Sequence, residues 1–238
     1  MERRNFLQWT ATAGAGTVAA SAAGATAAEN TRRTGPLRVH IVMYDGVEEL
    51  DYAAPFEVFS AAGMHSEHGV DVRLVTPGNP RLVHGGYGMR VKVAHRWAPE
   101  LADVIVVPGG GYTRRNGPGI WAEIAEGTLP RALAAAPRPG LIVSSLCTGA
   151  IVLAEAGLVQ GRPCTTHHGA ASELEARGGV LKDARVVDDG DLVTAGGITS
   201  GLDLGLWLVR RTLGSDAAVG VENMLEYQAR GTVWASVR

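Results

Sequence analysis

Long apolar runs alternate along this chain with segments whose apolar residues recur at helical spacing. Strand patterns occur at 37–44, 70–77, 103–107 and 140–146. Helical patterns occur at 50–63, 120–136, 148–158, 170–179, 200–214 and 215–228. Glycine turns inside 82–95 and 184–197 predict two strand–turn–strand pairs. Continuously apolar strands alternating with helices are typical of a doubly wound, mostly parallel sheet covered on both faces, which predicts a single α/β domain.

The apolar run 140–146 stops at Cys147, and a helical pattern begins directly after it. With Gly149 two residues further on, this order matches a nucleophile elbow, a tight turn that pushes the side chain out of the sheet. The free N–H groups and the positive dipole end of the following helix favour thiolate. We therefore expect the pKa of Cys147 to be modestly below the ~8.5 of a free thiol. A buried core cysteine without a chemical role is the alternative.

Residues 109–111 form a glycine-rich turn after another strand, where backbone N–H groups can approach a ligand closely. Together with the Thr148 N–H, they could form an oxyanion hole; a plain strand-ending turn would have the same sequence. The turn lacks the lysine of a phosphate-binding P-loop. Asp51 follows the first strand, between Leu50 and Pro55, and we expect it to point into the same cleft.

Several other titratable residues are interpreted in more ordinary ways. Asp45, Glu48 and Glu49 are expected to be solvated loop acids. His167 and His168 have no second ligand cluster at a metal-binding spacing, so no metal site is expected. One of these histidines would be a polar partner of the cysteine, and the other would lie on the surface.

The N-terminal segment has the features of an export signal. Arg3 and Arg4 precede a weakly apolar stretch rich in Ala, Gly and Thr, which closes with a small-residue cleavage site. We interpret residues 1–27 as a twin-arginine signal peptide rather than a membrane anchor, because such residues gain little from entering lipid. Residues 28–36 would be a flexible lead-in, and 37–238 the exported domain. No stable membrane insertion is expected after cleavage.

The composition narrows the classes of partner. The 238 residues are 46% hydrophobic and 19% charged, with a formal net charge of −2. These values are ordinary for a soluble domain and give no sign of nucleic-acid binding, so a small-molecule substrate is expected. In an oxidising compartment Cys147 and Cys164 could form a disulfide, and this alternative stays open.

Taken together, these motifs resemble the DJ-1/PfpI superfamily over about residues 37–227. The stretch GVEELDYAAP is similar to the family's G-x-E-E-x-[ED]-x-x-x-P loop, whose last acid, here Asp51, touches the reactive cysteine. VPGGG is similar to the turn whose second glycine, here Gly110, gives an oxyanion N–H. CTGAIVLAEAGL followed by TTHH is similar to the elbow and its histidine, here Cys147 and His167. The resemblance implies a flavodoxin-like fold and a homodimer.

Within the superfamily, Asp51 and the Cys-Thr-Gly sequence look like the isonitrile hydratase branch. Thr148 stands where protease-type members typically have histidine. The resemblance implies a cofactor-free enzyme that hydrates an isonitrile to an N-substituted formamide, with Cys147 as nucleophile and Asp51 as proton donor. One alternative is a cofactor-free glyoxalase or deglycase that acts on 2-oxoaldehydes and uses His167 as a proton shuttle. The other is an exported thiol redox sensor or stress-response protein.

Overall fold

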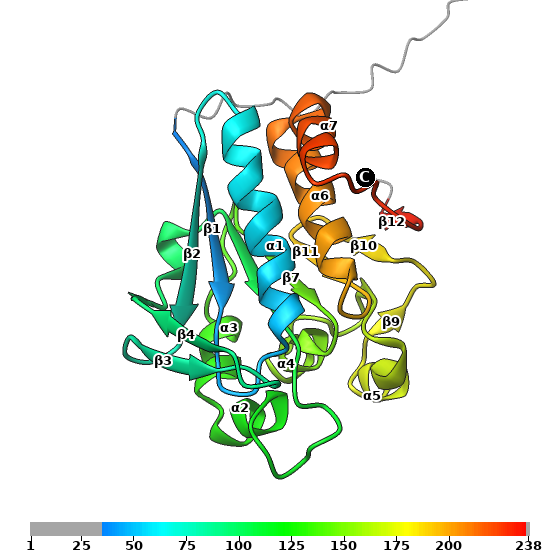
Figure 1. Cartoon of the computed structure of the whole chain (residues 1–238). Coiled ribbons are helices and arrows are strands. Elements are labelled where there is room, and N and C mark those ends of the chain that lie inside the picture. Colours follow the sequence, from blue (N-terminus) through cyan, green and yellow to red (C-terminus); the bar gives the residue numbers. More distant parts are fainter. Residues whose placement is uncertain (1–34, 237–238) are drawn as a thin grey trace, which may run out of the picture. The chain divides into compact units, whose positions relative to one another are not determined.

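An eight-stranded sheet runs through the described residues, 35–236 of the computed structural model (Figure 1). The strand order is β12-β10-β11-β7-β6-β1-β2-β5, and β10 with β11 is the single antiparallel pair in it. The strands are β1 (Leu37–Val42), β2 (Val70–Thr76), β5 (His95–Arg96), β6 (Val104–Val107), β7 (Ile142–Leu146), β10 (Val186–Asp188), β11 (Leu192–Ala195) and β12 (Val233–Ala235). The predicted α/β class with a mostly parallel sheet is confirmed.

Helices cover both faces of this sheet, as the doubly wound pattern predicts (Figure 1). One face carries α1 (Glu49–Ala62), α6 (Ser200–Leu213) and α7 (Ser215–Met224). The other carries α2 (Ile120–Glu126), α3 (Thr128–Ala134) and α4 (Gly149–Glu155), with α5 (Ala171–Ala176) beside α4. Short 3-10 turns are η1 (Gly63–His65), η2 (Pro99–Leu101) and η3 (His168–Ala170). The helical stretch over 120–136, with a break expected near Gly127 and Pro130, is divided at Gly127, whose φ of 74° ends α2.

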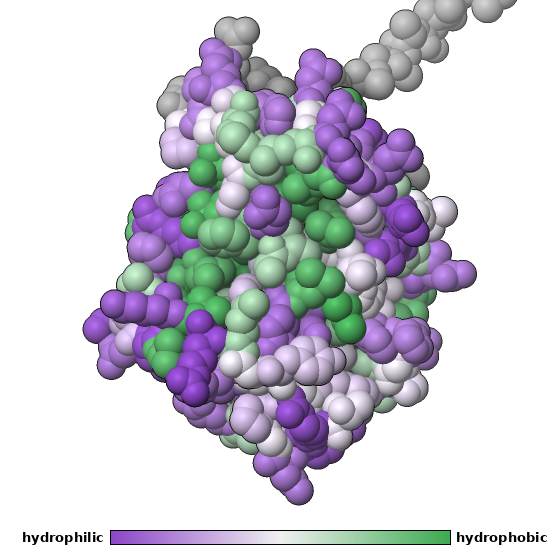
Figure 2. Space-filling model, viewed as in Figure 1, coloured by the Kyte–Doolittle hydropathy of each residue, from purple (hydrophilic) through white to green (hydrophobic). Residues whose placement is uncertain are grey.

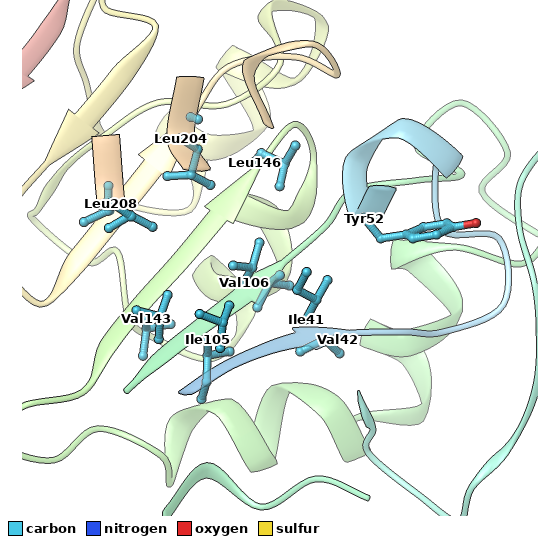
Figure 3. Close-up of a cluster of buried hydrophobic side chains, with 14 of the residues drawn as sticks. Ile41, Val42, Tyr52, Ile105, Val106, Val143, Leu146, Leu204 and Leu208 are labelled. Carbon is cyan, nitrogen blue, oxygen red and sulfur yellow. The ribbon is translucent and has the colours of Figure 1, made fainter. Parts of the chain in front are cut away.

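The core lies where the central strands meet these helices. Ile41 of β1, Val106 of β6 and Leu146 of β7 are fully buried and lie close together, with Leu204 and Leu208 of α6 beside them (Figure 3). Each such side chain contributes about 1.5–3 kcal/mol when it leaves water. This packing makes the three central strands a rigid support for the loops that follow them.

Smaller strand pairs surround the main sheet. β3 (Arg81–His84) and β4 (Arg90–Val93) form an antiparallel hairpin, as predicted for 82–95, and β8 (Pro163–Cys164) pairs with β9 (Val180–Leu181). The strand–turn–strand prediction for 184–197 corresponds to β10 and β11. β5 and β12 were not predicted, because strands of two or three residues are too short to show a period.

The sheet places the candidate chemistry at one edge. β1, β6 and β7 are parallel neighbours, so the residues that follow them meet beyond their carboxyl ends. Asp51, the glycine turn 109–111 and Cys147 follow these three strands in order. The interpreted signal peptide, 1–27, lies outside the described residues. No helix within residues 35–236 has the length and apolar character that crossing a membrane requires.

Candidate active site

Cys147 lies in the turn between β7 and α4, with the geometry expected of an elbow. Its φ of 52° falls in the left-handed region, which residues with a side chain rarely occupy. Its N–H donates to Gly196 O (2.7 Å), and its carbonyl accepts from Thr166 Oγ1 (2.7 Å) and His167 N (3.4 Å). These bonds hold the strained backbone and fix the sulfur at the edge of the sheet, where the residue is 6% exposed.

Glycine is required where the neighbouring loops approach this turn. A Cβ at Gly149 would collide with the carbonyl oxygen of Val107, at the end of β6. A Cβ at Gly109 would lie 3.0 Å from Asp51 Oδ2 and closer still to Thr148. The glycine turn therefore packs directly against the elbow and against the Asp51 carboxyl at the start of α1.

Asp51 is completely buried in the first turn of α1, beside the thiol of Cys147. Its Oδ2 accepts a hydrogen bond from Gly109 N (2.9 Å), and its Oδ1 has no nitrogen or oxygen partner among the described residues. Burial raises the pKa of Asp51 to about 7, against the opposing effects of the Gly109 N–H and the thiol. The expectation that Asp51 points toward the cysteine is consistent with this arrangement.

The expectation of a lowered cysteine pKa is wrong for this arrangement. Burial, and after it the charge of Asp51, raise the pKa of Cys147 to about 12. The N–H groups of Ile198 and Thr148 face the sulfur and act in the opposite direction, but less strongly. The Thr148 N–H at the helix terminus does lower the pKa of Cys147, but burial raises it by more. The sequence does not show how completely the sulfur is removed from water.

Gly110 and Thr148 are joined to each other. The Gly110 N–H, expected to face an oxyanion, donates to Thr148 Oγ1 (3.1 Å), so it could serve that role only by exchanging this bond. The φ of Gly110 is 146°, and a Cβ there would lie 2.6 Å from Glu48 N. Among the described residues, the neighbouring Gly111 N–H has no acceptor, and Gly111 lines the same pocket.

His167 is the histidine that reaches the cysteine pocket. Its Nδ1 accepts from Gly169 N (3.0 Å), so Nε2 carries the proton of the neutral ring. Burial, and then the neighbouring His168, lower the pKa of His167, and the two rings stack with centroids 4.3 Å apart. Within residues 35–236, no group of three His, Cys, Asp or Glu side chains could hold a metal ion.

A cavity of about 360 Å³ opens above the sulfur. The tip of the β3–β4 hairpin and the loop 111–114 both contribute to its walls. Its lining consists of Glu48, Gly86, Tyr87, Gly110, Gly111, Tyr112, Thr113, Arg114, Cys147, Thr148, His167 and Ile198. Asp51 is not among the lining residues, but its carboxyl contacts the thiol of Cys147, which is.

The loop acids are partly exposed, as expected, but two of them also make structural contacts that the sequence did not indicate. Asp45 accepts from His84 N (2.8 Å) and pairs with Arg81, which fastens the hairpin to the end of β1. Glu49 accepts from Tyr87 N (2.7 Å) at the hairpin tip, and Glu48 lines the pocket. The hairpin is distant from these acids in sequence, so their hydrogen bonds and ion pair with it could not be predicted.

Sequence reasoning also missed Ile198. This residue lines the pocket, has a φ of 33° and directs its N–H toward the Cys147 sulfur. A positive φ is a genuine outlier for a β-branched residue, so no sequence signal would have pointed to it. Its position follows from the tight turn that links β11 to α6. Cys164 is fully buried, and it and Cys147 are both free, so the disulfide of the alternative is not formed.

The sequence matches the DJ-1/PfpI family over residues 37–211, a range that contains Asp51, Gly110, Cys147 and His167. The chain belongs to the DJ-1/PfpI family. The resemblance inferred from the glycine turn, the acidic loop and the elbow is thereby confirmed. The roles of the individual residues stay predictions.

Members of this family with related sequences come from distant organisms. The isonitrile hydratase of Pseudomonas putida is 36% identical over 193 residues, which cover 80% of this chain and 78% of that protein. The Parkinson disease protein 7 homolog of Danio rerio is 27% identical over 193 residues, covering 78% and 94%. A THiJ/PfpI family protein from Pseudomonas syringae superposes with a TM-score of 0.72 at 24% identity, covering 82% and 77%. Drosophila melanogaster DJ-1beta has a TM-score of 0.70 at 20% identity, covering 81% and 99%.

Proposed function

We propose that this protein is a cysteine-dependent hydratase that converts an isonitrile to an N-substituted formamide. The observation that carries the proposal is the buried Asp51–Cys147 pair at the inner end of the pocket, since the reaction needs a nucleophile and a proton at one carbon. The 36% identity to the isonitrile hydratase of Pseudomonas putida supports this activity over others in the family.

The first step joins the sulfur to the terminal carbon of the isonitrile. With a pKa of about 7, Asp51 is partly ionised at neutral pH and can take the proton of the Cys147 thiol. The sulfur then attacks the terminal carbon, and the same proton passes from Asp51 to that carbon. The product is a thioimidate in which a new S–C bond and a new C–H bond have formed.

The second step uses one water molecule. Water adds to the thioimidate carbon, and a proton reaches the nitrogen. The C–S bond then breaks, the formamide carbonyl forms, and the sulfur recovers a proton from the hydroxyl group. Dividing the hydration in this way replaces one difficult step by two easier ones. His167 Nε2–H lines the pocket and can orient this water.

The decisive variants are Asp51→Asn and Cys147→Ala. Asn keeps the acceptor for the Gly109 N–H but can neither take nor give the proton, so turnover of an alkyl isonitrile should fall by at least ~100-fold. Cys147→Ala should abolish it. Formamide formation is followed by mass spectrometry, with Cys164→Ala as the matched cysteine control. Full activity in Asp51→Asn would reject the proposed proton path.

A glyoxalase or deglycase is the second candidate, favoured by the presence of His167 in the same pocket. That chemistry moves a proton between two carbons, so a histidine beside the cysteine would be as important as Asp51. Lactate formation from methylglyoxal, lost in His167→Ala and unaccompanied by any formamide from isonitriles, would replace the first proposal by this one. Under the hydratase proposal, His167→Ala costs less than Asp51→Asn.

We also propose export through the twin-arginine pathway, on the basis of Arg3, Arg4 and the weakly apolar stretch that follows them. Replacing both arginines by lysine should leave folded protein in the cytoplasm. The check is fractionation of cells that express each form, followed by immunoblotting. Equal secretion of the double variant would contradict the proposal.

A homodimer is the proposed assembly. Apolar side chains gather along α1 and the helices beside it in the face shown in Figure 2. Phe56, Met64, Val219 and Met224 of α1, η1 and α7 are among the exposed ones. A contiguous apolar area of this kind is typical of a protein–protein contact.

A further inference from the structure

The Cys147 pocket is larger than the reacting group needs. A terminal isonitrile is a narrow two-atom group, whereas the cavity measures about 360 Å³. A water-sized group occupies about 30 Å³, so there is room for on the order of ten non-hydrogen atoms. Most of the pocket must therefore receive the group that the substrate carries on its nitrogen.

Tyr112 gives this space one fixed aromatic wall. Its ring lies 5.6 Å from that of Trp121, and its carbonyl accepts from Trp121 Nε1 (2.7 Å). Arg115 packs over Trp121, with its guanidinium carbon 3.6 Å from the ring centroid, and is paired with Glu173. The Tyr112 ring is thus held in place before any ligand binds.

Tyr87 also lines this pocket, from the tip of the β3–β4 hairpin. Its backbone is anchored, because Glu49 Oε1 accepts from Tyr87 N (2.7 Å) and from Met89 N (3.3 Å). Gly86 N also donates to Val47 O (2.8 Å). Its side chain contrasts with this, since Tyr87 lines the pocket and is 83% exposed. Because the backbone is already fixed, only the side chain of Tyr87 loses conformational entropy when its ring turns onto a ligand.

The charges of the pocket favour an uncharged group. Glu48 and Arg114 both line it and interact with each other, so their charges offset. Arg114 also reaches across the mouth to the carbonyl of Gly86 (3.5 Å). No surplus charge is left among these lining residues for an ionic substituent.

We propose that Tyr87 and Tyr112 form an aromatic clamp that selects substrates with a flat, uncharged aromatic group. The isonitrile end of such a substrate points at Cys147, and its ring lies between the two tyrosines. Tyrosine pairs suit this purpose because each presents a large, stiff, apolar surface. The identity of the reacting group, an isonitrile, rests on the proposed function. The position of the two tyrosines in the pocket lining does not depend on it.

The test measures the pocket without relying on turnover. The rate at which Cys147 is alkylated by N-phenyl iodoacetamide is divided by the rate with iodoacetamide, and peptide mass mapping locates the label. Tyr87→Ala should lower this ratio about threefold to tenfold, since an aromatic contact of this kind is lost. Tyr87→Phe should keep the ratio of the parent. Leu82→Ala is the matched control, because Leu82 is 45% exposed on the same hairpin and outside the pocket lining.

The same variants are then compared in turnover of phenyl and methyl isonitrile. Tyr87→Ala should raise KM for the phenyl compound and leave the methyl compound unchanged. An unchanged labelling ratio in Tyr87→Ala overturns the clamp, as does faster labelling by a 4-carboxyphenyl reagent than by the phenyl one. If no isonitrile is consumed but the labelling ratio still depends on Tyr87, the hydratase proposal fails and the clamp stands.

Discussion

The thiol of Cys147 and the carboxyl of Asp51 are buried side by side, and their pKa values are displaced in the same direction, to about 12 and about 7. At neutral pH the sulfur is therefore held as a thiol until a base removes its proton. Oxidation of cysteine starts from the thiolate, so this sulfur should oxidise slowly in the resting protein. Measured oxidation of Cys147 by hydrogen peroxide checks this, and fast oxidation would favour the redox-sensor alternative.

The buried carboxyl also predicts how stability depends on pH. The pKa of Asp51 is raised from 3.8 to about 7 on folding, so its contribution is fully present below pH 3.8 and is lost as pH rises through 7. Asn cannot ionise, so the parent loses stability between pH 5 and pH 8 and Asp51→Asn does not. The free energy of unfolding of the variant, relative to the parent, should therefore rise by about 2–3 kcal/mol from pH 5 to pH 8. Urea unfolding of both proteins at the two pH values measures this difference. A difference independent of pH would mean that Asp51 is not the ionising group.

At the scale of elements, the strand–cysteine–helix order was enough to predict the elbow, because its residue types are dictated locally. The glycine turn 109–111 and the hairpin over 82–95 were predicted for the same reason. What the sequence could not show is which segments meet: Glu49 holds Tyr87, and Ile198 faces the sulfur, only because distant turns are folded together. The extent of burial at Cys147, and hence its pKa, is also a property of the assembled loops.

The junction between β6, β7 and α4 depends on the absence of one carbon atom. Gly149→Ala would drive a Cβ into the backbone carbonyl of Val107, which cannot move without shifting a central strand. The free energy of unfolding should fall by about 1–3 kcal/mol or more. Gly78→Ala is the control, since nothing lies within 4 Å of a Cβ there. Chemical denaturation of both variants provides the comparison, and equal stabilities would show that the junction can yield.

At the scale of the whole molecule, the sheet separates two sets of helices with different surroundings. α2, α3 and α4 lie on one face, and Trp121 of α2 anchors the loop that lines the Cys147 pocket. α1, α6 and α7 lie on the other face, where α1 and α7 carry exposed apolar side chains (Figures 1 and 2). Asp51 lies in α1 as well, so an assembly through this helix would stiffen the element that holds the carboxyl.

The dimer proposal is tested on that helical face. Phe56→Glu combined with Met224→Glu should convert a dimer to a monomer, because two charges would have to be buried without partners. Light scattering after gel filtration gives the mass, and Leu101→Glu is the control at an exposed apolar residue of η2. A monomeric parent protein, or an unaffected double variant, would contradict the proposed contact.

The sheet ends on both sides in very short strands, β5 with two residues and β12 with three. An open strand edge offers free N–H and C=O groups to any other chain that can extend beside it. β12 covers β10 in this way, through the pairs from Val186 with Val233 to Asp188 with Ala235. A chain cut before Val233 would leave β10 as a bare edge, separated by β11 alone from β7, the strand that leads to Cys147. We expect the truncated chain to aggregate through this exposed edge while its Cys147 pocket stays folded.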